Sequence, residues 1–93
     1  MIASFANAAA RAAWERRYVK GYSSDVLRIA HRKLLQLQNA QRLDDLRAPP
    51  GNRLEALSGD RAGLHSIRIN DQWRICFRWR EGDAHDVALV GYH

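Results

Sequence analysis

A strict alternation of apolar and polar side chains between positions 66 and 80 constrains the fold of this chain more than any other feature. The odd positions carry the large apolar residues, Ile67, Ile69, Trp73, Ile75, Phe77 and Trp79. The even positions carry Ser66, Arg68, Asn70, Arg74, Cys76, Arg78 and Arg80. Successive side chains of a β-strand point to opposite faces, so this pattern predicts antiparallel strands with one face on a core.

The pairing of these strands follows from the same parity, because directly opposed residues of antiparallel strands share a face. Ile69 should oppose Trp73 across a loop of residues 70–72, since a two-residue loop would set Ile69 against Arg74. A second three-residue loop at positions 81–83 gives the pairs Phe77 with Val87, Ile75 with Leu89, and Arg78 with Asp86. The second half of the chain therefore predicts a three-stranded meander.

The polar face of this meander presents Arg68, Arg74 and Arg78. Residues 61–80 contain five Arg against one Asp, and like charges on adjacent strands repel unless an anion lies over them. Thirteen of the fifteen basic residues are Arg, whose planar fork suits phosphate oxygens. The pattern favours phosphate binding, although a plain solvated face and an Arg-rich genome remain the alternatives.

The first half of the chain predicts helices. Residues 1–5 are interpreted as a short strand, and Asn7 as the N-cap of an alanine-rich helix that runs to Gly21. Ser23 or Ser24 then caps a second helix, whose apolar stripe is Leu27, Ala30, Leu34 and Leu37. The segment LDDLRAPPGN breaks the helical pattern, and everything after it is interpreted as strands.

Length and composition indicate one compact domain over residues 1–93, and the helical and strand patterns indicate that it is α+β. Cys76 is the only cysteine, which excludes an intramolecular disulfide and leaves no cysteine cluster for zinc. The sequence contains no apolar run of membrane-spanning length and does not open like a secretory signal. These features predict a cytoplasmic protein without a membrane partner.

Three segments resemble a known family. They are NRLEALSGDRAG at 52–63, SIRINDQWRICFRW at 66–79 and GYH at 91–93. With PPGN before them, they resemble HigB-type toxins of the RelE toxin–antitoxin family over nearly the whole chain. The resemblance implies two N-terminal helices packed on one face of a twisted, mainly antiparallel sheet. It also implies a ribosome-dependent endoribonuclease that cuts messenger RNA without a metal or other cofactor, using the RNA 2′-hydroxyl as nucleophile.

The resemblance assigns roles to particular residues. Arg74 would contact the scissile phosphate, Tyr92 would stack on a base, and His93 would transfer a proton. Glu55 stands where some family members carry His and would act as the base. The remaining RNA-binding candidates are Arg53, Arg61, Arg68 and Arg78. The implied partners are the ribosome, messenger RNA and a separate helix-turn-helix antitoxin, through which alone the toxin would meet DNA.

Two departures from the family pattern lead to a second hypothesis. Ser58 occupies a position that is often basic, and Gly91 replaces the acidic residue that commonly precedes Tyr-His. The alternative function is therefore a catalytically weakened toxin fold that acts through antitoxin binding and co-repression. A basic RNA-binding domain without a partner is a third reading. Toxicity on expression, and a neighbouring gene for a helix-turn-helix protein, would separate the three.

Overall fold

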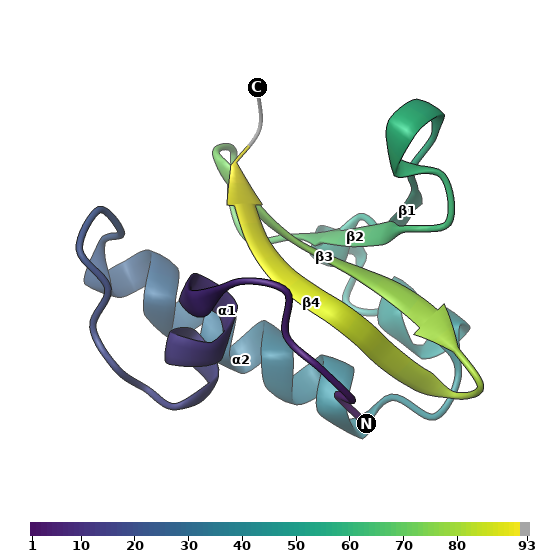
Figure 1. Ribbon diagram of the computed structural model, residues 1–93, viewed down its shortest axis with the longest axis horizontal. Coiled ribbons are helices and arrows are strands. Elements are labelled where there is room, and N and C mark those ends of the chain that lie inside the picture. The colour runs from purple at the N-terminus through teal and green to yellow at the C-terminus, as the bar shows by residue number, and fades with distance from the viewer. Residues whose placement is uncertain (92–93) are drawn as a thin grey trace.

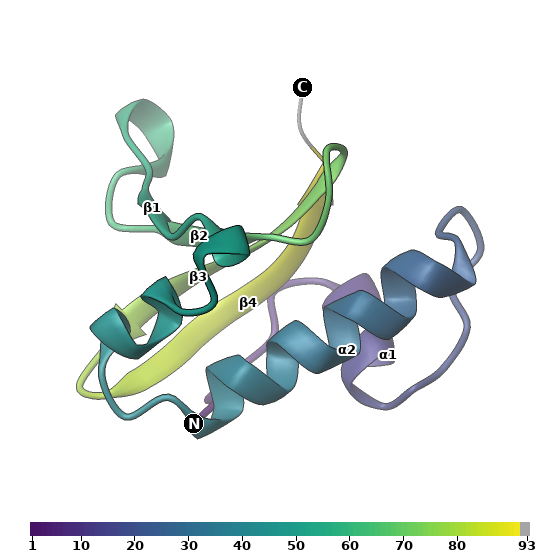
Figure 2. The same ribbon diagram turned by 180° about the vertical axis from the view of Figure 1, so that it is seen from behind.

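The computed structural model describes residues 1–91 and shows helices packed on one face of an antiparallel sheet (Figure 1), as the sequence predicts. Tyr92 and His93 lie outside the described residues. The helices are α1 (Ala8–Trp14) and α2 (Ser24–Asn39), and the strands are β1 (Glu55–Ala56), β2 (His65–Arg68), β3 (Trp73–Arg80) and β4 (Asp83–Gly91). The sheet order is β1-β2-β3-β4, and Figure 2 shows both helices on the same side of it.

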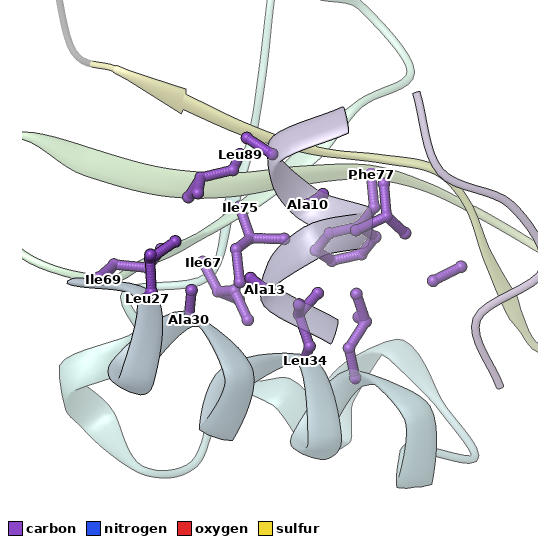
Figure 3. Close-up of a cluster of buried hydrophobic side chains, with 14 of the residues drawn as sticks. Ala10, Ala13, Leu27, Ala30, Leu34, Ile67, Ile69, Ile75, Phe77 and Leu89 are labelled. Carbon is purple, nitrogen blue, oxygen red and sulfur yellow. The ribbon is translucent and has the colours of Figure 1, made fainter. Parts of the chain in front are cut away.

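The core lies between the helices and the odd-numbered side chains of the sheet. The predicted stripe of α2 is buried at Leu27, Ala30, Leu34 and Leu37. It meets Ile67, Ile75 and Phe77, each fully buried, as Figure 3 shows. The burial of these residues confirms both the apolar stripe of α2 and the inward direction of the odd-numbered sheet residues. These faces form the core because they carry enough apolar area to exclude water.

Helix α1 begins as predicted but ends earlier. The Asn7 side chain caps it by accepting from the Ala10 amide at 3.0 Å. The helix stops at Trp14, not near Gly21, because Arg16 takes a left-handed φ of 60°. The Arg17 amide then donates to the Ala12 carbonyl at 2.8 Å, and the Arg16 amide to Ala13 at 3.2 Å. This Schellman pattern satisfies the last carbonyls and ends the helix.

The N-terminal segment is not a strand, contrary to the prediction. It makes two isolated parallel bridges to β4, Ile2 with Ala84 and Phe5 with Val87. Between the two bridges, Asp86 of β4 has a left-handed φ of 53°. This irregularity interrupts the ladder of hydrogen bonds, so no continuous strand forms along β4.

The first hairpin has the predicted register. Arg68 is opposite Arg74, and the Ile69 amide donates to the Trp73 carbonyl at 2.9 Å. The Asn70 side chain accepts from the Trp73 amide at 2.9 Å and so closes the loop. The loop therefore spans residues 70–72, as the parity of the apolar residues requires.

The second hairpin differs from the prediction in its turn. Glu81 and Gly82, with φ of 52° and 81°, form a two-residue connection that pairs Arg80 with Asp83. Arg78 consequently opposes His85, so the predicted pairing with Asp86 is wrong. A register shift between Cys76 and Arg78 then restores the predicted pair Ile75 with Leu89. The bulge inserts one residue, which returns Val87 and Leu89 to the core face.

The chain between α2 and β2 is irregular over residues 43–52, as predicted, but it also forms a turn at Gly59–Arg61 where strand was predicted. It forms three short 3₁₀ turns, at Leu43–Arg47, Pro50–Asn52 and Gly59–Arg61. β1 contains only two residues and pairs Glu55 with Ser66. This short strand is the edge of the sheet, and it brings Glu55 next to the polar face.

Candidate functional site

Neither α1 nor α2 covers the other face of the sheet (Figure 1), although Ser66, Arg74 and Cys76 on this face are buried by other residues of the domain. This outer face consists of the even-numbered strand residues between positions 66 and 78, namely Ser66, Arg68, Arg74, Cys76 and Arg78. The pairing places Arg68 opposite Arg74, and Ser66 opposite Cys76. The candidate residues on β2 and β3 therefore share one surface, as their parity predicts.

Arg74 and Glu55 form the central contact of the outer face. An Arg74 Nη2 to Glu55 Oε1 distance of 3.2 Å defines an ion pair. The Arg74 side chain is only 10% exposed, whereas that of Glu55 is 53% exposed. The expectation that Arg74 lies openly on the surface is therefore wrong. β1 places the Glu55 carboxylate beside the Arg74 guanidinium. Surrounding residues of the same domain bury most of the Arg74 side chain.

Two more arginines of the outer face also have carboxylate partners. Arg68 pairs with Asp71 in the first hairpin loop, and Arg78 Nε lies 3.6 Å from Asp86 Oδ2 at the bulge. These carboxylates offset part of the repulsion among the arginines, so like-charge repulsion alone does not require a bound anion. Sequence reasoning missed the role of Asp71, although its place three residues after Arg68 was a usable signal.

A groove of about 260 Å³ adjoins this surface. Its lining residues are Ala6, Arg61, Leu64, Cys76, Arg78, Asp86, Ala88 and Val90. Gly63 lies beside it with a φ of 93°, and a Cβ at this position would come within 2.9 Å of Arg78 Nη1. The left-handed backbone favours glycine here, whereas the contact with the flexible end of Arg78 can be relieved by a shift of that side chain.

Cys76 does not behave as the cationic surroundings suggest. Burial raises the pKa of the Cys76 thiol above its usual range, and Arg74 and Arg61 oppose that rise only in part. The side chain is 5% exposed. Cys76 is thus a small packing residue of the outer face, whose arginine neighbours lower its pKa by less than burial raises it.

A buried amide anchors the chain that leads into β1. Asn52 is fully buried, and its Nδ2 donates to Gln36 Oε1 at 3.0 Å and to the Leu46 carbonyl at 3.1 Å. Its Oδ1 accepts from Lys33 Nζ. Burial, and then Arg32 and Arg68, lower the pKa of Lys33. Asn52 thus ties α2 to the segment that positions Glu55.

The other candidates lie at varying distances from this centre. Arg53 is exposed, with a left-handed φ of 46° directly after Asn52. Arg61 is exposed on the short turn at Gly59–Arg61 and lines the groove with Arg78. The structure thus brings together Glu55, Arg74 and Arg68, with Arg61 and Arg78 beside them.

The C-terminal end of β4 returns to the same region. Val90 opposes Arg74, and Gly91 opposes Trp73. The proposed roles of Tyr92 and His93 fall outside the described residues. Gly91 itself belongs to a strand that is paired up to its last residue.

The described residues, 1–91, contain no candidate metal cluster and no candidate membrane span. No three His, Cys, Asp or Glu side chains in that range are grouped so that they could hold a metal ion. None of the helices in the same range is long and apolar enough to cross a membrane.

An α+β domain whose arginine-bearing sheet face lies opposite its helices suits a protein that acts on a polyanion. The family model for the RelE-like toxin HigB of type II toxin–antitoxin systems matches residues 5–93. The chain belongs to this family, as the sequence resemblance indicates.

Three curated proteins are similar to the chain. Toxin HigB-1 of Vibrio cholerae is 50% identical over 58 residues, which are 62% of this chain and 61% of that protein. An uncharacterized protein of Haemophilus influenzae is 30% identical over 66 residues, 71% of this chain and 65% of that protein. Endoribonuclease HigB of Proteus vulgaris is 33% identical over 94 residues and is matched over the full length of both. The matched segments thus span less than two thirds of the first two relatives.

Proposed function

We propose that the protein is the toxin of a type II toxin–antitoxin pair and cuts messenger RNA on the ribosome, with the outer face as its active surface. The observation that carries this proposal is the ion pair of Arg74 and Glu55, 3.2 Å apart, with Arg68 of β2 directly opposite Arg74. The name Endoribonuclease HigB, borne by a relative matched over its full length, supports the same activity.

The pair supplies two of the functions that RNA self-cleavage requires. The 2′-hydroxyl of the RNA attacks the adjacent phosphorus, a bond forms from O2′, and the bond to the 5′-oxygen of the next nucleotide breaks. Arg74 donates hydrogen bonds to the non-bridging oxygens, where negative charge accumulates. The half-exposed Glu55 accepts the 2′-hydroxyl proton. No cofactor is needed, because the RNA provides its own nucleophile.

The other arginines hold the flanking phosphates in this proposal. Arg68, Arg61 and Arg78 lie beside the pair, and Arg53 precedes β1. RNA phosphates take the place of the carboxylates of Asp71 and Asp86 next to Arg68 and Arg78. The bound strand is then fixed in line for attack, which accounts for much of the rate enhancement in such reactions.

The last two residues complete the proposed site. Gly91, the last described residue, pairs with Trp73, which is next to Arg74 in sequence. On that ground we keep Tyr92 and His93 in the proposed active site. Tyr92 stacks on a base next to the cleavage point, and His93 donates a proton to the departing 5′-oxygen. The partners are the ribosome, the message and a helix-turn-helix antitoxin that neutralises the toxin.

The products of cleavage test this mechanism. Purified protein is incubated with ribosomes programmed with a defined message, and the fragment ends are identified. We expect a 2′,3′-cyclic phosphate, or its opened form, and a 5′-hydroxyl on the downstream fragment. Glu55→Gln should slow the cleavage by about 10²-fold or more, as expected for loss of a general base. The exposed Glu81→Gln is the matched control. Downstream 5′-phosphate ends produced by this protein directly would refute the mechanism.

A weakened toxin fold that acts through antitoxin binding is the second candidate, and Gly91 and Ser58 favour it. If the missing carboxylate slows His93, Gly91→Asp should raise the cleavage rate, because a carboxylate favours the charged imidazole and orients it. If both Gly91→Asp and the parent cleave nothing, while the antitoxin still binds, the second candidate is correct. If removal of Tyr92 and His93 leaves cleavage intact, the proton donor lies elsewhere.

A further inference from the structure

A second cavity lies on the helical side of the molecule, away from the outer face. It has a volume of about 530 Å³ and opens between the end of α1, the connection that follows it and the first half of α2. Its lining residues are Ala13, Arg16, Arg17, Tyr18, Ser24, Leu27, Arg28 and His31. Figure 2 shows that both helices and their connection lie on the opposite side of the sheet from the outer face. The mechanism above uses none of these residues.

The floor and the rim of this helical pocket differ in chemistry. Ala13 and Leu27 are buried in the core and present aliphatic surface from below. Arg17 and Arg28 stand exposed at the rim, with side chains 59% and 65% exposed. Tyr18 is 73% exposed and lies beyond the end of α1. An occupant must therefore bring an apolar group for the floor and negative charge for the rim.

The pocket wall is held by a specific set of contacts. Arg16 Nε donates to His31 Nε2 at 3.1 Å, and His31 Nδ1 donates to the Ala13 carbonyl at 3.0 Å. The left-handed conformation of Arg16 is unfavourable for a residue with a Cβ, and glycine is usual at this helix end. Arg16 retains this conformation while it links α1 to α2. His31 is thus a bridge between the helices.

The positive charge of the rim arginines is paired only with carboxylates that do not line the pocket. None of the described residues that line the pocket is acidic. Glu15 and Asp25 pair with Arg17 and Arg28 at 2.7 and 3.2 Å, but these carboxylates are themselves exposed. Exposed pairs of this kind contribute little to stability. Carboxylates of a partner can therefore replace them at small cost.

We propose that the helical pocket binds an acidic segment of the partner antitoxin, a separate polypeptide, which places an apolar side chain on Ala13 and Leu27 and carboxylates against Arg17 and Arg28. This inference rests on the antitoxin partnership within the proposed function. The aliphatic floor favours a protein side chain over RNA. Bases stack on the faces of aromatic rings, and among the residues that line the pocket Tyr18 is the exposed ring.

This docking mode leaves the outer face uncovered by that segment. Glu55 then stays half exposed, and Arg74 keeps the small exposure it has in the free toxin, while the antitoxin segment is bound to the helices. This docking mode also predicts that a short RNA oligonucleotide still binds to the toxin–antitoxin complex.

Charge reversal at the rim tests the proposal. The purified cognate antitoxin is titrated into wild type, Arg17→Glu, Arg28→Glu and the double variant, and binding is measured by calorimetry. Each single reversal should raise the Kd about tenfold or more, equal to about 1.4 kcal/mol. Arg47→Glu is the matched control, because Arg47 is 69% exposed and pairs with Asp44 in the same i,i+3 arrangement as Arg28 with Asp25. It should leave the Kd within about twofold.

Hydrogen exchange of the complex supplies a second readout. Protection should concentrate at residues 13–18 and 24–31. Protection confined to residues 55–78, an unchanged Kd in the double variant, or no complex with wild type would each overturn the inference. Loss of RNA affinity in the rim variants, with antitoxin affinity intact, would do the same. Cleavage is assayed separately: a complex without cleavage refutes the nuclease, whereas cleavage without rim-dependent binding refutes the docking site.

Discussion

Arg74 combines a position at the centre of the outer face with almost complete burial. A buried cation needs a counter-charge, and Glu55 supplies it from the edge strand. Because Glu55 is half exposed, water solvates the carboxylate if its partner is removed. Loss of Arg74 should therefore cost less stability than loss of Glu55, which would leave the guanidinium buried without this carboxylate, and Glu55 itself stays accessible to a substrate.

Arg74→Ala should separate function from folding. We expect cleavage to fall by about 10²- to 10³-fold, as for loss of a donor that stabilises transition-state charge. The melting temperature should fall by no more than about 4–8 °C, which corresponds to about 1 kcal/mol in a domain of this size. Arg80→Ala, at the exposed end of β3, should change neither. A large fall in melting temperature would show that Arg74 is chiefly structural.

The Cys76 thiol provides a probe of the burial of the outer face. Since burial raises its pKa, the folded thiol keeps its proton where the unfolded thiol has lost it. Its contribution to stability is thus present below the ordinary thiol pKa and lost as the pH rises through the folded value. Alkylation by iodoacetamide near pH 8 should be more than about tenfold slower in the folded protein than in denaturant. Equal rates would mean that the thiolate is exposed.

Asn52 shows how one residue can position a whole element. Its amide connects α2, the carbonyl of Leu46 and Lys33, and the chain enters β1 three residues later. Asn52→Ala leaves buried polar groups without partners, so the free energy of unfolding should fall by about 1–3 kcal/mol. Cleavage should also fall, because Glu55 loses its support. Urea unfolding measures the first effect, with the exposed Asn39→Ala as control; equal stability of both variants would contradict this role.

The second hairpin carries strain that can be relieved. Glu81 has a left-handed φ of 52° and is followed by Gly82 with a φ of 81°, which is the geometry of a type I′ turn. Asn tolerates this conformation better than Glu. Glu81→Asn should therefore raise the free energy of unfolding by about 0.5–1 kcal/mol. Glu81→Ala, which removes the charge but retains the strain, should not, and equal stabilisation by both would show that charge is responsible.

At the scale of the whole molecule, the net charge of +5 is distributed over both sides of the sheet. The outer face concentrates arginines for a polyanion, while the helical pocket presents arginines around an aliphatic floor. The two surfaces lie on opposite layers (Figure 1). One small domain can thus offer separate sites to RNA and to a protein partner.

Salt dependence should distinguish the outer face from the helical side. If Arg61, Arg68, Arg74 and Arg78 each neutralise a phosphate of single-stranded RNA, the logarithm of affinity should fall with the logarithm of salt at a slope of roughly −3. Arg61→Ala should reduce the magnitude of this slope by about 0.7. Arg47→Ala should leave it unchanged, because Arg47 lies on the turn at Leu43–Arg47. Filter binding at several salt concentrations measures both slopes, and a flat dependence would exclude phosphate contacts.

Local pattern determined much of this protein. Strand parity predicted the core face, the register of the first hairpin and the shared surface of Arg68, Arg74 and Arg78, because side-chain direction alternates residue by residue. The apolar stripe of α2 followed from helical periodicity. The matched family was identified by three short segments. Each of these properties depends on neighbours along the chain.

Tertiary structure alone decided the remainder. The early end of α1 depends on Arg16 and His31, which belong to different helices. The bulge at Asp86 reconciles a two-residue turn with a core that must stay in register, so it cannot be inferred from either hairpin strand separately. The burial of Arg74 comes from an edge strand of two residues, too short to show a periodic pattern. These features arise from contacts between distant segments, whose free energies become defined only when the layers pack.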